Sequence, residues 1–138
     1  MPHHIHKLTI ATHGPSLTDF TREAADWVAE TQIDTGLLTL FCRHTSASLV
    51  IQENAAPEVQ SDLIAAFDRF APEGSHYLHD SEGPDDMPAH IKAALTQTHL
   101  AIPVVAGRLV LGTWQGLYLF EHRSRPHQRE VVLHLAGD

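Results

Sequence analysis

Metal-binding chemistry is indicated by residues 79–90, which read HDSEGPDDMPAH. This segment combines two histidines and four carboxylates with turn-forming glycine and proline, and it holds few side chains that could build a core. Its candidate ligands are His79, Asp80, Glu82, Asp85, Asp86 and His90. Carboxylates this close together repel one another, and a divalent cation would offset that repulsion. The pattern therefore indicates a loop that presents metal ligands, and the alternative is a solvated acidic loop with incidental histidines.

Anion-binding chemistry is indicated by residues 43–48, which read RHTSAS after a strand-forming apolar run. The hydroxyls of Thr45, Ser46 and Ser48, together with nearby backbone N–H groups, form a compact set of donors. His44 lies beside them in the sequence. Serine and threonine are also ordinary turn residues, so the alternative is a simple turn.

A third group of polar residues ends the segment GTWQGLYLFEHR, residues 112–123. Because neighbouring residues of a strand point to opposite faces, Glu121 and Arg123 would share one face while His122 lies on the other. Glu121 and Arg123 could form a solvent-facing ion pair of little energetic weight. His122, with aromatic and aliphatic neighbours, is either a satisfied core histidine or a ligand.

Strands and a few helices must position these groups. Apolar patterns predict strands over residues 3–12, 37–45, 46–53, 100–105, 107–114, 116–123 and 129–136. Helical spacing predicts helices over residues 18–31, 55–70 and 88–97, with Thr18 capping the first and Pro88 opening the last. No linker or repeat interrupts the 138 residues, so we expect residues 1–138 to form a single domain. The predicted fold class is α+β, with an antiparallel sandwich or barrel-like core and flanking helices.

Composition narrows the class of partner and compartment. The net charge of −8 argues against nucleic acid or an anionic membrane as a partner through bulk electrostatics. A single cysteine, Cys42, excludes an internal disulfide and a cysteine-rich zinc motif, and it suits a reducing compartment. No apolar run reaches transmembrane length and the N-terminus lacks a signal-peptide layout, so we expect a cytoplasmic protein without a membrane partner.

The three groups fall in stretches by which the chain resembles the YjbQ-like proteins, the secondary thiamine-phosphate synthase enzyme family. The matching stretches are residues 36–54, 79–92 and 107–123, and the resemblance extends from about Leu8 to Gly137. It implies a compact sandwich-type fold of antiparallel strands with flanking helices. It also implies a homotrimer, a polar pocket near a subunit boundary and a weak thiamine-phosphate synthase-like activity.

Four histidines lie inside the matching stretches, namely His44, His79, His90 and His122. A catalytic zinc site needs three protein ligands and keeps one position open. We expect His79 and His90 to be one pair of ligands, because the acids between them could orient their second ring nitrogens. His44 and His122 compete for the third place, and the one that is not a ligand could act as general acid or base. The expected cofactor is a divalent metal, with zinc preferred.

The leading functional hypothesis is a small metal-assisted enzyme that acts on a phosphorylated metabolite. Thr45, Ser46 and Ser48 would hold the phosphate together with the guanidinium of Arg123. The usual thiamine-phosphate synthases are α/β barrels, which a chain of 138 residues is too short to form, so this activity could be a side reaction.

Three further residues complete this hypothesis. Asp85 and Asp86 would organise the metal or activate a water molecule, and Trp114 would stack on a heteroaromatic substrate. The alternatives are a non-enzymatic protein that binds a metal or a small molecule, and a metal-dependent phosphate-ester hydrolase.

Overall fold

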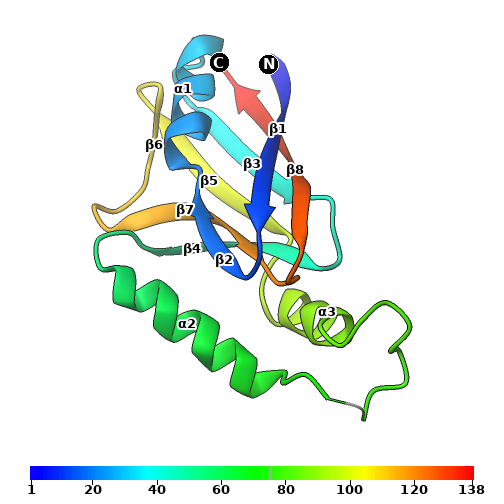
Figure 1. Ribbon diagram of the computed structural model, residues 1–138. Helices are drawn as coiled ribbons and strands as arrows, with labels where there is room; N and C mark the ends of the chain where they lie inside the picture. The colour runs from blue at the N-terminus through cyan, green and yellow to red at the C-terminus, as the bar shows by residue number, and fades with distance from the viewer. Residues whose placement is uncertain (75) are drawn as a thin grey trace.

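Two antiparallel sheets curl around a common core and form a half-barrel with three helices (Figure 1). The computed structural model describes residues 1–74 and 76–138. The strands are β1 (His3–His13), β2 (Ser16–Asp19), β3 (Gly36–Cys42), β4 (Ala47–Glu53), β5 (His99–Val105), β6 (Arg108–Leu109), β7 (Gln115–Glu121) and β8 (Pro126–Gly137). The helices are α1 (Thr21–Thr31), α2 (Pro57–Phe70) and α3 (Asp86–Leu95). The predicted α+β class with an antiparallel core is confirmed.

The larger sheet has the order β1-β8-β3-β5-β6 and the smaller sheet has the order β2-β7-β4. Alternation along β8 directs Val131, Leu133 and Leu135 into the core, where each is fully buried. Val28 of α1 packs into the same cluster. The core therefore lies between the two sheets and α1.

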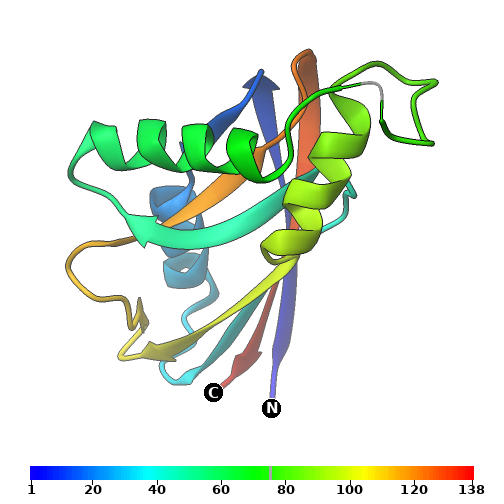
Figure 2. The same cartoon turned by 90° about the horizontal axis from the view of Figure 1, so that it is seen from below.

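Helices α2 and α3 lie on the side of the smaller sheet that faces away from this core (Figure 2). Leu63, Ile64 and Phe67 of α2 pack on Tyr118 and Phe120 of β7. The chain between α2 and α3 contains the acidic segment, so the packing of both helices fixes where that segment begins and ends.

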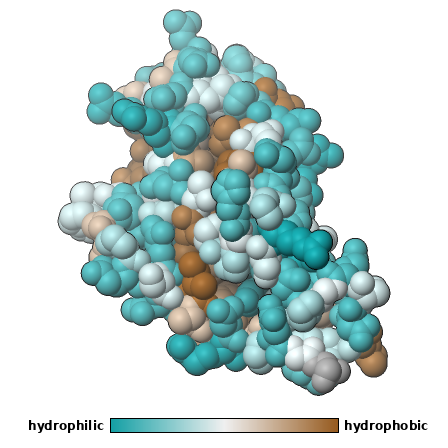
Figure 3. Space-filling view, in the orientation of Figure 1, coloured by the Kyte–Doolittle hydropathy of each residue, from teal (hydrophilic) through white to brown (hydrophobic). Residues whose placement is uncertain are grey.

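The outward face of the larger sheet carries no helix in either view (Figures 1 and 2). It exposes large apolar side chains, including Leu37 and Phe41 of β3, Val105 of β5 and Ile5 of β1. The face seen in Figure 3 is mostly hydrophilic, with its hydrophobic surface confined to narrow strips. No helix in the described part of the chain is long and apolar enough to cross a membrane.

The first predicted helix is wrong at its beginning. Residues 16–19 form β2 and pair with β7, so Thr18 lies in a strand and cannot cap α1. The Asp19 carboxylate takes over that role and accepts hydrogen bonds from Thr21 N and Oγ1, at 2.9 and 2.6 Å. Pairing with a neighbouring strand outweighs the helical pattern at this point.

Two other predicted elements differ in length. Helix α3 begins at Asp86, so Pro88 lies within its first turn and does not open it. The strand predicted over residues 107–114 shortens to Arg108–Leu109, and residues 110–114 form the connection to β7. The earlier start of α3 has a direct consequence for the site, because it brings Asp86 into the helix.

Candidate functional site

The two histidines of the acidic segment converge on Asp86. His79 Nε2 lies 2.7 Å and His90 Nε2 lies 3.1 Å from the same oxygen, Asp86 Oδ2. Asp86 and His90 are four residues apart on α3 and therefore share one face of the helix, while His79 comes from the preceding loop. The three candidate ligand atoms all lie within 4.8 Å of one another. This spacing suits the coordination sphere of a single metal ion.

Partners outside the cluster orient two of its members, His90 and Asp86. His90 Nδ1 lies 2.8 Å from the carbonyl oxygen of Thr45, which can only accept, so Nδ1 carries a proton and Nε2 is the ring nitrogen that would bind a metal. Asp86 Oδ1 accepts a hydrogen bond of 2.7 Å from Arg123 Nη1, which leaves Oδ2 for the histidines. Outer partners of this kind are what metal-binding imidazoles and carboxylates usually have.

Asp86 stays ionised although its side chain is only 3% exposed. Burial by itself would raise the pKa of this carboxyl, but the hydrogen bond from His79 and the charges of His90 and Arg123 outweigh burial and lower the pKa below its ordinary value. A buried carboxylate that is ionised at neutral pH is a strong ligand for a divalent cation.

Arg123 holds the acidic segment in place. Its Nε donates to Asp85 Oδ2 at 2.9 Å, its Nη1 donates to Asp86, and its Nη2 donates to the carbonyl of Glu82 at 3.0 Å. The hydrogen bond to Asp85 is the main reason that the pKa of Arg123 is raised. With these three contacts, the guanidinium faces the acidic segment and does not point toward residues 45–48.

The solvent-facing ion pair that Glu121 and Arg123 could have formed does not form, because each binds another partner. Glu121 is completely buried and binds Arg129, through Nε at 2.7 Å and Nη2 at 2.5 Å, and it also accepts a hydrogen bond from Thr12. Burial alone would raise the pKa of Glu121, but the bonds from Arg129 and Thr12 lower it instead. Arg129 is not among the residues predicted above, although alternation in β8 places it on the same inward side as Val131.

The serine and threonine segment is used mostly inside the protein. Ser46 Oγ accepts a hydrogen bond of 3.0 Å from Arg129, and Ser48 Oγ lies 2.9 Å from His122 Nε2. Ser46 is 8% exposed and Ser48 is fully buried. Thr45 is exposed, and its carbonyl contacts His90, so among these three residues it alone lies at the surface beside the metal-ligand cluster.

His44 and His122, the two histidines expected to compete as third ligand, lie outside the cluster that the described residues form. His44 Nε2 accepts the backbone N–H of Glu130 at 2.8 Å, and burial followed by the charge of Arg129 lowers the pKa of His44. The third candidate ligand of the cluster is Asp86 instead.

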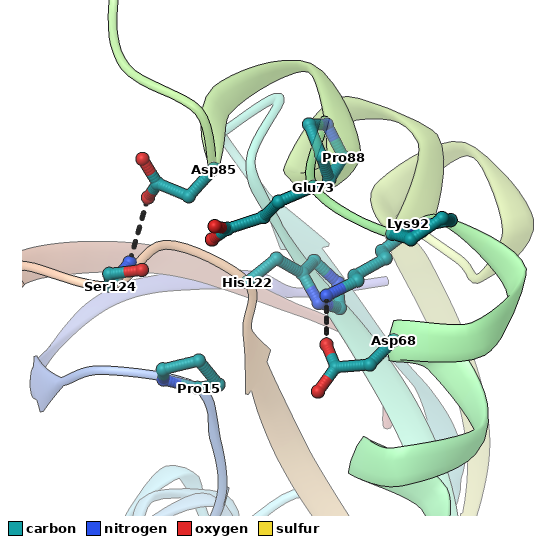
Figure 4. A pocket seen from close by; sticks show the side chains of 9 residues that line it. Pro15, Asp68, Glu73, Asp85, Pro88, Lys92, His122 and Ser124 are labelled. Carbon is teal, nitrogen blue, oxygen red and sulfur yellow. Dashed lines mark hydrogen bonds and ion pairs between the residues drawn. The ribbon is translucent and has the colours of Figure 1, made fainter. Parts of the chain in front are cut away.

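His122 is 3% exposed and lines a cavity of about 330 Å³, whose wall also contains Asp85, the sequence neighbour of Asp86 (Figure 4). Burial, followed by the charge of Lys92, lowers its pKa to about 3, so the imidazole is neutral at physiological pH. Its Nδ1 is the one buried side-chain polar atom in the described part of the chain that has no hydrogen-bond partner.

Trp114 is separated from the other candidates. It is 62% exposed and precedes β7, whereas His122 follows the other end of this seven-residue strand. At about 3.3 Å per residue, the two lie roughly 25 Å apart. Within one chain, the structure does not bring Trp114 to the cluster.

The fold and the cluster together define a small α+β protein in which two histidines and a carboxylate converge. A family model described as "UPF0047 protein YjbQ-like" matches residues 6–138. The chain therefore belongs to the UPF0047, YjbQ-like family. The description of the family names no reaction, so the synthase-like activity stays a prediction.

Similar proteins come from bacteria and archaea. UPF0047 protein sll1880 of Synechocystis sp. is 56% identical over 132 residues, covering 95% of this chain and 90% of that protein. UPF0047 protein YugU of Bacillus subtilis is 34% identical and covers 91% of this chain and 93% of its own. A crystal structure of hypothetical protein APE1520 from Aeropyrum pernix K1 has a TM-score of 0.90 at 27% identity, covering 98% of this chain and 99% of that one. The fold is therefore shared across the length of the chain.

Proposed function

We propose that the protein binds one divalent metal ion, with zinc preferred, and uses it on a small phosphorylated metabolite. The ligands would be His79 Nε2, Asp86 Oδ2 and His90 Nε2. The observation that carries this proposal is the convergence of these three atoms within 4.8 Å of one another. Nitrogen and carboxylate ligands at this spacing are suited to zinc, and a two-histidine, one-carboxylate set also accommodates other first-row metals.

An enzymatic role is supported by the number of ligands. Three protein ligands leave a fourth position for water or substrate, as catalytic zinc sites do. The His79 side chain is 44% exposed, so the cluster is reachable from solvent on that side. A metal ion there would supply Lewis-acid stabilisation to phosphate oxygens.

The remaining residues receive more specific roles in this proposal. Arg123 holds Asp85 and Asp86, and thereby positions the acidic segment. Thr45 is the member of the hydroxyl segment placed to contact a phosphate at the metal. The thiamine-phosphate synthase-like reaction releases pyrophosphate, and a divalent metal suits the departure of that anion; we propose it as a slow side activity.

The test of the metal site is elemental analysis of purified, tag-free protein. We expect about one divalent ion per chain in the wild type and a sharp loss in both His79→Ala and His90→Ala. His13→Ala is the matched control, because His13 is exposed at the end of β1. Full metal content in both site variants after dialysis against a chelator would overturn the proposal.

A non-enzymatic binding protein is the second candidate, and one contact favours it. Glu82 Oε2 lies 3.3 Å from His79 Nε2, so Glu82 could supply a fourth ligand and close the coordination sphere. X-ray absorption spectroscopy of the zinc-loaded protein distinguishes the two. Four protein ligands in the wild type that fall to three in Glu82→Gln would favour binding over catalysis.

Self-association as a homotrimer in the cytoplasm is also a proposal. It is supported by the bare outward face of the larger sheet, where Leu37, Phe41 and Val105 expose 46, 49 and 55% of their surface. Light scattering should give three times the chain mass of 15.3 kDa. A monomer at all micromolar concentrations would contradict it.

A further inference from the structure

The cavity lined by His122 and Asp85 has in its wall a residue with a buried nitrogen that no described residue satisfies. His122 Nδ1 has no hydrogen-bond partner in the part of the chain that the structure describes, and the His122 side chain forms part of the cavity wall (Figure 4). A buried polar atom without a partner costs free energy, and such an atom in a native protein requires an explanation. Since the ring lines an open space, a ligand in that space is the partner that the structure provides for.

The hydrogen bonds behind His122 decide whether Nδ1 donates or accepts. Thr96 Oγ1 lies 2.9 Å from the carbonyl of Lys92 and 2.6 Å from Ser48 Oγ, but it has only one proton to give. The Lys92 carbonyl is in the last turn of α3, and the N–H of Thr96 bonds to Ala93 instead. The Thr96 proton therefore belongs on the Lys92 carbonyl.

This assignment propagates along the chain of hydrogen bonds. With its proton used, Thr96 can only accept from the Ser48 hydroxyl, and Ser48 in turn accepts from His122 Nε2 at 2.9 Å. The proton of the neutral imidazole thus lies on Nε2. Nδ1 therefore carries a bare lone pair, and the group that satisfies it must be a donor.

The charges around the cavity favour the same kind of ligand. Its wall contains the carboxylates of Asp68, Glu73 and Asp85 and the ammonium of Lys92. Lys92 Nζ is already paired with Asp68 at 2.6 Å, and Asp85 is paired with Arg123. Glu73 makes no ion pair with any described residue, and its carboxylate reaches between Asp85 and His122 in Figure 4.

We propose that this cavity binds the amino- or amidino-bearing part of a small molecule, with His122 Nδ1 accepting a hydrogen bond and Glu73 supplying the opposite charge. Pro15 and Pro88 add apolar wall against which a flat ring packs. The volume of about 330 Å³ is ample for one ring, since a cavity of ~150 Å³ holds benzene. The inference deepens the proposed function by naming one end of its substrate. The inference rests on the proposed function only for the reaction that the bound molecule would undergo, and the binding in the cavity is argued independently of it.

The test uses metal-free protein and three probes of one shape, namely benzamidine, benzamide and benzoate. Long-range ¹H–¹⁵N NMR of the histidines reports both ring nitrogens, and the His122 signals are identified by their loss in His122→Phe. We expect an unprotonated Nδ1 in the free protein. Benzamidine should shift the Nδ1 resonance in a saturable way, and benzoate should leave it unchanged.

Two charge-matched variants separate cavity binding from adsorption to an acidic surface. Glu73→Gln lies in an exposed loop, so the variant should fold, and it should weaken benzamidine binding about threefold or more. Glu23→Gln on α1, also exposed, should leave the affinity unchanged.

Two outcomes would overturn the inference. One is a protonated Nδ1 or a response to benzoate in place of benzamidine, which would make the cavity an anion site around Lys92. The other is equal weakening by Glu73→Gln and Glu23→Gln. Neither result depends on zinc, so a failure here is distinguishable from a failure of the metal site.

Discussion

Replacing Arg123 by methionine tests how the acidic segment is held. The variant removes the hydrogen bonds to Asp85, Asp86 and the Glu82 carbonyl while keeping most of the side-chain volume. Asp86 is only 3% exposed, so its charge would be left with the two histidines alone. Breaking one side of a buried ion pair costs about 3–5 kcal/mol, and the partial exposure of Arg123 places this case near the lower end. We expect a loss of about 3 kcal/mol in the free energy of unfolding.

The assay is urea unfolding of metal-free protein at pH 7. Arg125→Met is the matched control, because Arg125 is exposed, and it should change stability by no more than about 0.5 kcal/mol. Added zinc should shrink the loss in Arg123→Met, since a bound cation would compensate Asp86. In an Asp86→Asn background, Arg123→Met should cost distinctly less than in the wild type.

The ion pairs of Arg123 with Asp85 and Asp86 also predict a loss of stability in acid. Because the pKa values of Asp85 and Asp86 are lowered on folding, the unfolded chain binds more protons in acid. Their contribution is therefore complete above the ordinary value of 3.8 and is lost as the pH falls below it. Arg123→Met should show a smaller acid loss than the wild type. A cost below about 1 kcal/mol at pH 7, or an equal cost in both backgrounds, would refute the role given to Arg123.

Three further predictions concern His122, the pair of Arg129 and Glu121, and His44. The pKa of His122 falls from 6.5 to about 3 on folding, so wild-type stability should drop as the pH falls below 6.5, by up to about 1.4 kcal/mol per pH unit from this residue. The variant His122→Leu should flatten this dependence of stability on pH. An unchanged pH dependence of the urea midpoint in that variant would contradict the prediction. Arg129→Met should lower the free energy of unfolding by about 3–5 kcal/mol, because it leaves Glu121 buried and unpaired, whereas replacing both residues by apolar ones should lower it much less. Equal losses for the single and the double variant in thermal unfolding would show that the pair is not coupled. His44→Ala and His122→Ala should each slow synthase-like turnover at least about tenfold while keeping full metal content, and a rate loss that matches a large drop in melting temperature would indicate packing instead.

Much of the fold is predictable from local pattern. The alternation in β8 and the amphipathic face of α2 are visible in the sequence, and both elements form where the pattern indicates. The exception is Ser16–Asp19, where a helical pattern yields to pairing with β7, a strand about a hundred residues away. Local propensity cannot report a partner at that distance.

The candidate site likewise has one part that is predictable from local sequence and another part that depends on distant partners. Its metal ligands lie in one short segment, so spacing and residue type could single them out, although their role stays a prediction. The placement of His122 could not be foreseen, because its hydrogen bond with Ser48 depends on the register of β7 against β4, and the charge of Lys92 that acts on it depends on the packing of α3. Arg129 was missed because a charged residue in an alternating strand is ordinarily assigned to the solvent side.

The shortness of the segment that carries His79, Asp86 and His90 has a consequence for how the site opens. Closing a loop of so few residues costs little chain entropy, and the hydrogen bonds that hold the segment go to Thr45, Arg123 and Ser124, which lie in connections and not in a strand. Release of a metal would therefore be a local event, in which residues 79–90 loosen while both sheets stay folded. Amide hydrogen exchange should show zinc slowing exchange in this segment and in the first turn of α3, with the core strands exchanging at the same rate in either state.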